Sequence, residues 1–171
     1  MKTLVLGLIF LGLANLSFSQ NELAYLDITS KIKFNEVKKA SNNADFLNSF
    51  ASIDISKRIL TFQKVAANFD IKKDPVYTRT KPTTYTVTFK ESNNEIKNIY
   101  SQKGKILSSN QTFTEVRLPY AISSKITKEH PEWAINQVDC TIVYTEGKAV
   151  NIAYKVKLKK GNHIKTIKFR E

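Results

Sequence analysis

The stretch that decides the fold is VNIAYKVKL, residues 150–158, in which a large apolar side chain occupies every second position without a slip. Alternation with a period of two is typical of a β-strand that has one buried face and one face in solvent. We therefore expect a long strand here, with its even-numbered residues facing the helices. Lys155 and Lys157 then point to the opposite, open side of the sheet.

Strand patterns flank this stretch on both sides. Residues 138–144 alternate in the same way, and Glu146-Gly147 predicts the turn that joins the two strands. After residue 158, Gly161-Asn162 predicts another turn, and the apolar pair at 167 and 169 predicts a closing strand. The C-terminal third of the chain is therefore expected to form an antiparallel meander.

A second meander is predicted earlier in the chain. Residues 84–90 alternate apolar side chains with threonine and lysine, and the turn at 92–94 leads into residues 95–101. A tight turn at 102–104 precedes a short return strand through residues 106 and 107. Residues 111–116 are predicted to add an irregular edge.

Each meander follows a segment with helical periodicity. Asp54 or Ser56 can cap the first helix, and the pattern ends at Asp70. The second helix is expected to begin near Leu118 and to end before Pro131, because a residue that precedes proline avoids the helical region. The predicted stripes are Ile59, Leu60, Phe62, Val65, Ala66 and Phe69 in the first helix, and Ala121, Ile122, Lys125, Ile126 and Glu129 in the second.

The order helix, meander, helix, meander favours an α+β fold, in which an antiparallel sheet carries helices on one face. It also predicts two tandem helix-plus-meander units, at about 56–110 and 118–171, within a domain that covers 56–171. Residues 20–55 are expected to form a poorly defined N-terminal arm. Its apolar residues are isolated (Leu26, Ile28, Ile32 and Phe34), and residues 40–48 look turn-like.

The N-terminus predicts export. Residues 1–19 combine a positive start, an apolar run at 4–13 and small residues at Ser17 and Ser19, which is the pattern of a secretory signal peptide. The run is too short to span a bilayer, which needs about 20 residues, although a short membrane anchor remains the alternative. A lipid anchor would need a cysteine at the cleavage site, and the chain has only Cys140. We expect a periplasmic or secreted protein that is not a lipoprotein.

Charge narrows the class of partner. The chain carries 27 lysines and arginines against 15 acids, for a formal net charge of +12, and the basic residues become denser towards the C-terminus. Outside the cytoplasm nucleic acid is not an expected partner. An acidic protein surface, an anionic glycan or lipid head groups are physically reasonable. The alternative is a solvated basic sheet face with no partner.

The sequence offers little for catalysis. His130 precedes a helix-ending proline, His163 is expected in a turn, and Cys140 lies in an apolar alternation as a predicted core residue. No nucleophile motif, clustered metal ligands or phosphate-binding glycine loop is present. Trp133 is expected to pack under the helix end, or else to form a ligand platform. We expect no enzyme, no cofactor and no metal, with a carboxylate pair for glycoside hydrolysis as the remote alternative.

A family resemblance rests on residues 99–107, IYSQKGKIL, and on the segment that follows them. These residues resemble the hairpin of PepSY-like proteins, and the long closing hairpin with its lysines is similar to the end of such a unit. The match covers about 57–171. The further matching positions are Val116, Leu118, Pro119, Ala121, Ile122, Ile126, Glu129, His130, Pro131 and Trp133.

The resemblance implies a small exported protein, PepSY-like or beta-lactamase-inhibitor-like (BLIP-like), with tandem units of a helix and a four-stranded sheet and with no enzymatic activity. The best-known member of the wider fold group inhibits an enzyme with its open sheet face. That inhibitor's contact residues have no counterparts here, and the last unit ends one strand short. Inhibition of beta-lactamase itself is therefore not expected.

These observations predict an exported, non-catalytic binding or inhibitor-like domain, expected to be a monomer, whose open sheet face holds an unidentified ligand. The alternative is an envelope-associated structural protein that binds acidic polysaccharide or lipid head groups. The predicted open face contains Thr84, Thr86, Thr88, Lys90, Asp139, Thr141, Lys155, Lys157, Lys159, Lys168 and Arg170. Within it, the candidate partner-binding residues are Lys155, Lys157, Lys159, Lys168 and Arg170.

Overall fold

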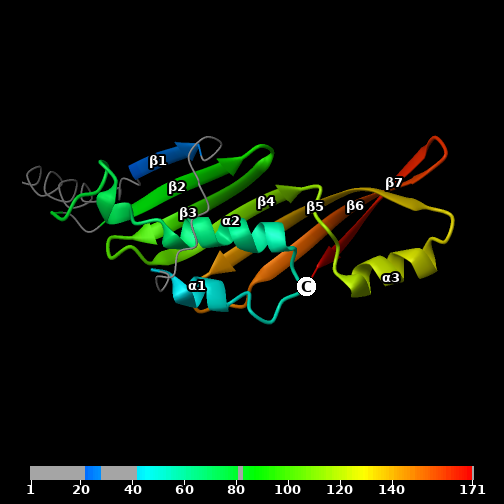
Figure 1. The fold of residues 1–171 in the computed structure, drawn as a ribbon, viewed down its shortest axis with the longest axis horizontal. Coiled ribbons are helices and arrows are strands. Elements are labelled where there is room, and N and C mark those ends of the chain that lie inside the picture. Colours follow the sequence, from blue (N-terminus) through cyan, green and yellow to red (C-terminus); the bar gives the residue numbers. More distant parts are fainter. Residues whose placement is uncertain (1–21, 28–41, 81–82, 171) are drawn as a thin grey trace, which may run out of the picture.

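The computed structural model describes residues 22–27, 42–80 and 83–170. Within these ranges the chain is an α+β fold, with a seven-stranded sheet whose strands lie side by side in chain order (Figure 1). The first strand runs parallel to the second, and all later neighbours are antiparallel. The predicted signal segment 1–19 lies outside the described residues, as do Ile28, Ile32 and Phe34.

The elements follow one another as a strand, a short helix, a long helix, a meander, a third helix and a second meander. Their bounds are β1 (Glu22–Asp27), α1 (Ala44–Asn48), α2 (Lys57–Asn68), the 3₁₀ turn η1 (Ile71–Lys73), β2 (Thr84–Glu91), β3 (Asn94–Ser101), β4 (Ile106–Thr114), α3 (Tyr120–Glu129), β5 (Ala134–Thr145), β6 (Asn151–Lys160) and β7 (His163–Arg170).

The strand phase predicted from residues 150–158 is confirmed. Ile152, Tyr154, Val156 and Leu158 are all buried, whereas Lys155 is exposed. Cross-strand pairing extends the buried face from β6 through β5 and β4 to β3 and β2. A single buried face therefore runs across these strands, and the side chains of alternate residues form the other, open face.

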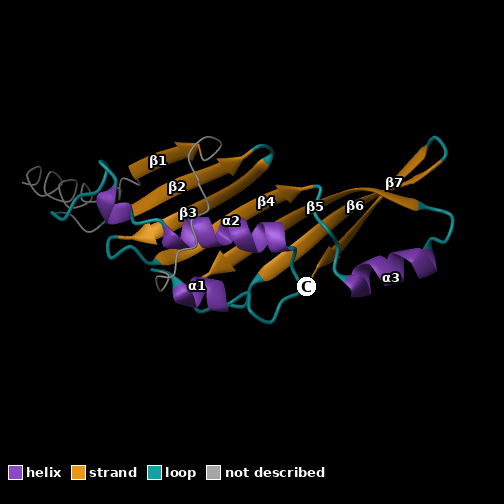
Figure 2. Ribbon diagram, in the orientation of Figure 1, coloured by secondary structure: helices purple, strands orange, loops and turns teal. Residues whose placement is uncertain are grey.

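The helices lie on the buried face (Figure 2). Phe62 of α2 makes an edge-on ring contact with Phe113 of β4, at a centroid distance of 6.2 Å. The predicted cap of this helix is Ser56, whose side chain accepts a hydrogen bond from the Ile59 amide at 3.4 Å. Ring contacts of this kind add to the free energy gained by burying apolar area.

Helix α3 packs at the far end of the sheet. Ile122 and Ile126 are buried as predicted, and the Lys125 ammonium lies 6.0 Å from the centre of the Phe169 ring on β7. Ala121 and Glu129, also predicted for the buried stripe, are exposed. The contact surface of α3 is thus narrower than its periodicity predicts.

Residues 111–116 were predicted wrongly as an irregular edge. Residues 106–114 form one continuous strand, β4, which lies in the middle of the sheet between β3 and β5. The alternation was hidden because two of its buried positions are polar: Ser109 and Gln111 are each 1% exposed.

Residues 44–48 were also predicted wrongly, since they form helix α1 rather than a turn. Phe46 and Phe50 are each 1% exposed, and the Phe46 ring meets Tyr144 of β5 edge-on at 5.0 Å. A helix of five residues is too short to display a periodic stripe. The described part of the predicted N-terminal arm therefore belongs to the fold, because β1 pairs with β2 and α1 contributes to the core.

Candidate binding surface

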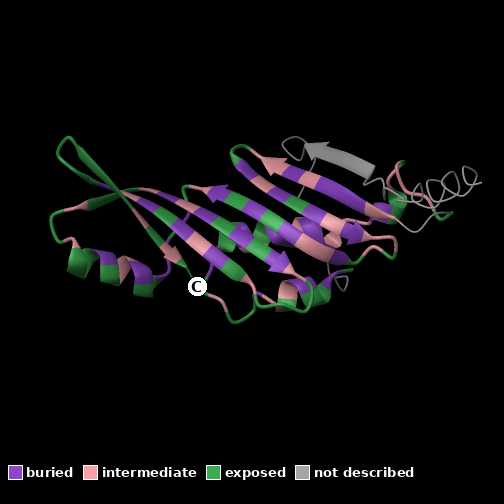
Figure 3. Cartoon of the chain, turned by 180° about the vertical axis from the view of Figure 1, so that it is seen from behind, coloured by how far each residue is buried: buried purple, intermediate pink, exposed green. Residues whose placement is uncertain are grey.

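Cations gather at the C-terminal end of the open face, the side seen in Figure 3. Lys155, Lys157 and Lys159 alternate along β6, and Lys168 and Arg170 follow on β7. The register places Lys155 directly opposite Lys168. The structure thus brings all five predicted binding residues onto one surface, which we call the basic face.

The basic face is open to solvent. Lys157 is half-buried, and the other four side chains are exposed. Alternate residues of a strand lie about 6.8 Å apart and neighbouring strands about 4.8 Å apart. These spacings fall within the Debye length of about 8 Å at physiological salt. The cations therefore repel one another, and a bound anionic surface would relieve that repulsion.

One carboxylate sits beside the basic face. Within the described strands β5, β6 and β7, Asp139 is the only acidic residue. Its Oδ1 accepts a hydrogen bond from Gln137 Nε2 at 2.8 Å, and Gln137 Oε1 accepts one from the Lys157 ammonium at 3.0 Å. Asp139 also lies opposite Lys155 in the register. None of the ion pairs within the described part of the chain involves the basic face.

The rest of the open face is a polar platform. Its exposed or half-buried threonines are Thr84, Thr88, Thr112, Thr114 and Thr141. Thr86 was also predicted for the open face, but it is only 4% exposed and is not available to a partner. Lys90 is paired with Glu95 at 3.3 Å. Exposed Lys97 of β3 lies on the same face and was missed, although its position between buried Ile96 and Asn98 carried the signal.

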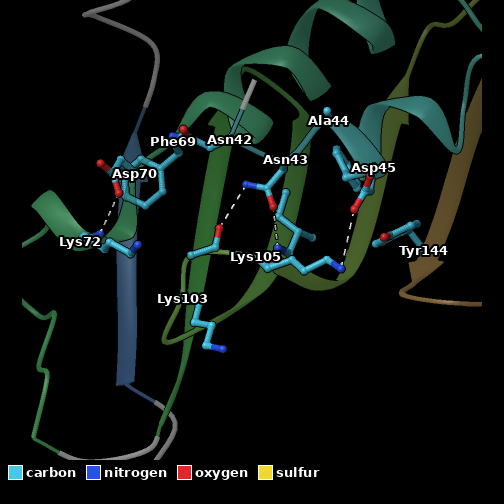
Figure 4. Close-up of a pocket in the computed structure, with 13 residues that line it drawn as sticks. Asn42, Asn43, Ala44, Asp45, Phe69, Asp70, Lys72, Lys103, Lys105 and Tyr144 are labelled. Atoms are coloured by element: carbon cyan, nitrogen blue, oxygen red, sulfur yellow. Dashed lines mark hydrogen bonds and ion pairs between the residues drawn. The ribbon is translucent and has the colours of Figure 1, made fainter. Parts of the chain in front are cut away.

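A second candidate site is a cavity of about 530 Å³ at the opposite end of the sheet (Figure 4). It lies between the start of α1, the segment that links α2 to η1, and the turn between β3 and β4. Three aromatic rings line it, Phe46 of α1, Phe69 of the linking segment and Tyr144 of β5, together with charged groups of both signs. The charged lining residues are Asp45, Asp70, Lys72, Lys103 and Lys105.

The buried amide in this cavity is fully engaged. Asn43 Nδ2 donates to the carbonyl oxygens of Ala67 and Gly104, both at 3.2 Å, and its Oδ1 accepts from the Ile106 amide at 2.7 Å. Asn43 therefore ties the residues before α1 to helix α2 and to the β3–β4 turn. This arrangement braces the fold and leaves no amide group for a ligand.

The charges of the cavity are also largely balanced. Lys105 pairs with Glu146 and, at 3.7 Å, with Asp45. Hydrogen bonding and Coulomb attraction to Glu146 raise the pKa of Lys105, and burial raises the pKa of the Tyr144 phenol. Both groups keep their usual protonation state at neutral pH. The cavity is thus a weaker candidate than the basic face.

A row of polar side chains lies buried under α2. Gln63 Nε2 donates to Gln111 Oε1 at 2.9 Å, and the Gln111 amide donates to the Ser109 hydroxyl at 3.0 Å. Nearby, the Tyr100 hydroxyl donates to the Ala66 carbonyl at 2.7 Å, and burial raises the pKa of this phenol. These bonds join the helix to the centre of the sheet, where no partner can reach.

The residues weighed for catalysis lie on separate elements. His130 caps the C-terminus of α3, His163 is the first residue of β7 rather than a turn residue, and Cys140 is fully buried in β5. Trp133 packs partly buried against the core near the end of α3, as predicted. Within the described ranges, no cluster of three or more histidine, cysteine or acidic side chains is placed to hold a metal ion.

Comparison with known proteins adds no relative: no protein-family profile, curated protein or solved structure matches this chain. Among the helices that the structure describes, none has the length and apolar content needed to cross a membrane. The function must therefore be argued from the surface itself.

Proposed function

We propose that the protein is an exported, non-catalytic binding protein that docks an acidic partner on the basic face. The observation that carries this proposal is the gathering of five cations on one solvent-facing side of β6 and β7, with Asp139 as the one acid on the described strands around them. Such a surface attracts an acidic partner at long range and fixes its orientation on contact.

The shape of the surface supports a macromolecular partner. Small-molecule sites are concave and largely apolar, whereas this face is a sheet surface lined mainly by lysine, arginine and threonine, with Val143 and Ile164 as exposed apolar side chains. The open sheet face would press against the partner, as an inhibitor covers an enzyme. The helices on the other side of the sheet would support the strands.

The proposal includes the tandem architecture of PepSY-like and beta-lactamase-inhibitor-like proteins. In this scheme α2 with β2–β4 is one unit, and α3 with β5–β7 is the other. The repeated element order supports the scheme, and pairing between β4 and β5 would fuse the units into one sheet. Export rests on the signal-like residues 1–19.

The test is binding to soluble polyglutamate, measured by calorimetry on residues 20–171, the mature protein under the proposed export. We expect the triple variant Lys155→Glu, Lys157→Glu, Lys168→Glu to bind at least about tenfold more weakly, because three attractive charges become repulsive. The matched control is Lys57→Glu, Lys64→Glu, Lys73→Glu, which changes the net charge equally at exposed positions on and beside α2.

Equal weakening by both triple variants would overturn the basic face as the site, since net charge alone would then explain binding. The competing envelope-binding function has a separate signature. If a sulfated polysaccharide or anionic vesicles bound more tightly than polyglutamate, with a steep loss on adding salt, the acidic-protein proposal would be wrong and the envelope function would replace it.

A further inference from the structure

Among the strands that the structure describes, β7 has a neighbour on one side only. It pairs with β6 along residues 163–170, and no other described strand lies beside it. At the opposite edge β1 already covers β2. An uncovered edge presents a row of backbone donors and acceptors that another strand can join.

The hairpin geometry identifies which backbone groups face outward. A two-residue turn, Gly161-Asn162, links the paired residues Lys160 and His163, and Gly161 has a φ of +56°. In two-residue hairpins the pair flanking the turn exchanges hydrogen bonds, and the alternation continues along the strand. The backbone N–H and C=O groups of His163 therefore point toward β6. Those of Ile164 and of every second residue after it point outward, at Thr166, Lys168 and Arg170.

The helix-facing side of β7 is incompletely covered. Ile167 and Phe169 are half-buried, whereas the residues opposite them on β6, Val156 and Tyr154, are 0% and 1% exposed. A further strand beside β7 would place its own apolar side chains next to Ile167 and Phe169. It would complete a layer that β7 alone leaves half open to water.

Charge decides the kind of strand that fits. Residues 163–170 contain lysines, an arginine and a histidine but no acid. A second copy of β7 would bring like charges together across the new pair, which is destabilising. An incoming strand with acidic residues on the open side would instead face Lys168 and Arg170.

We propose that the partner contributes an extended segment of alternating acidic and apolar residues, which adds a strand to the free edge of β7. This inference rests on the proposed function and specifies how the acidic partner is held. The acidic side chains would lie on the basic face, the apolar ones would cover Ile167 and Phe169, and the backbone would bond to the outward groups of β7.

The test uses a labelled peptide of alternating glutamate and valine, equal in length to β7, and a second peptide with N-methyl groups on alternate amides. N-methylation removes backbone donors from one edge but keeps the side chains and the charge. We expect the N-methylated peptide to bind the unaltered protein at least about tenfold more weakly by fluorescence anisotropy. Equal affinity of the two peptides would overturn strand addition.

Protein variants give an independent check. Thr166→Pro removes an outward amide at an exposed edge position, where proline is tolerated. We expect about tenfold weaker binding of the glutamate–valine peptide, whereas Thr166→Ala keeps the amide and binds as the unaltered protein does. If proline and alanine behaved alike with the melting temperature retained, the edge would not be the docking site.

Failure of this inference is distinguishable from failure of the proposed function. The triple charge variant of the basic face should weaken both peptides by the same factor, because both carry the same acidic side chains. If the triple charge variant bound the peptides as tightly as the unaltered protein does, the proposed function would be wrong. If the two peptides bound equally well but the triple charge variant still bound both more weakly, only strand addition would be wrong.

Discussion

The two ends of the sheet are built from similar hairpins but are covered to different degrees. Phe89 of β2 is 2% exposed and contacts Phe69 edge-on at 5.4 Å, whereas Phe169 of β7 is half-buried with the Lys125 ammonium over its ring. The first end is covered by the segment that follows α2, where the Phe69 ring meets Phe89 and the Tyr77 ring lies 5.6 Å from that of Tyr85. At the second end α3 closes β7 only in part. The β2 end is therefore packed into the core, whereas the β7 end keeps apolar surface in contact with water.

The largest effect is expected within β6, where the two faces can be compared at neighbouring positions. Ile152→Asp should prevent folding, because an unpaired charge buried in the core costs several kcal/mol, a large part of about 5–15 kcal/mol of total stability. Circular dichroism on the mature protein tests this. Lys155→Asn, on the open face of the same strand, is the control and should leave the melting temperature nearly unchanged, since it sets no second carboxylate opposite Asp139. Equal loss in both variants would contradict the assigned strand phase.

A smaller effect compares the two ends directly. Phe89→Ala should lower the free energy of unfolding by about 3–5 kcal/mol, because it removes a fully buried ring. Phe169→Ala should lower it by less than half as much, since the transfer free energy scales with the area removed from water. Urea denaturation of both variants measures the difference. Similar losses at the two positions would show that the β7 end is as tightly packed as the β2 end.

The sequence predicted the parts of this fold in which one physical signal dominates. Alternation in residues 150–158 gave the correct strand phase, and Ser56 and Pro131 marked helix ends correctly. It missed α1 because five residues show no period and because Tyr144, the sheet residue that the Phe46 ring contacts, is distant in the sequence. It missed the central position of β4 because buried Ser109 and Gln111 read as solvent-facing residues.

The residues of the candidate site could be predicted from the sequence, but the extent of the accessible surface around them could not. The lysines of β6 and β7 follow from alternation and from the turn at Gly161. The burial of Thr86 does not follow from the sequence. Thr86 holds a polar position in the alternation of residues 84–90, which predicts that it faces solvent. Neither the free edge of β7 nor the half-covered ring of Phe169 could be inferred, since both depend on which strand pairs with which.

The most direct test of the central claim is amide chemical-shift mapping of the mature protein titrated with polyglutamate. The account predicts that the largest shifts fall on β6 and β7, around Lys155, Lys157 and Lys168, and that the amides of α1 and α2 hardly move. Shifts centred instead on the cavity around Asn43 and Lys103, with β6 and β7 unchanged, would contradict it.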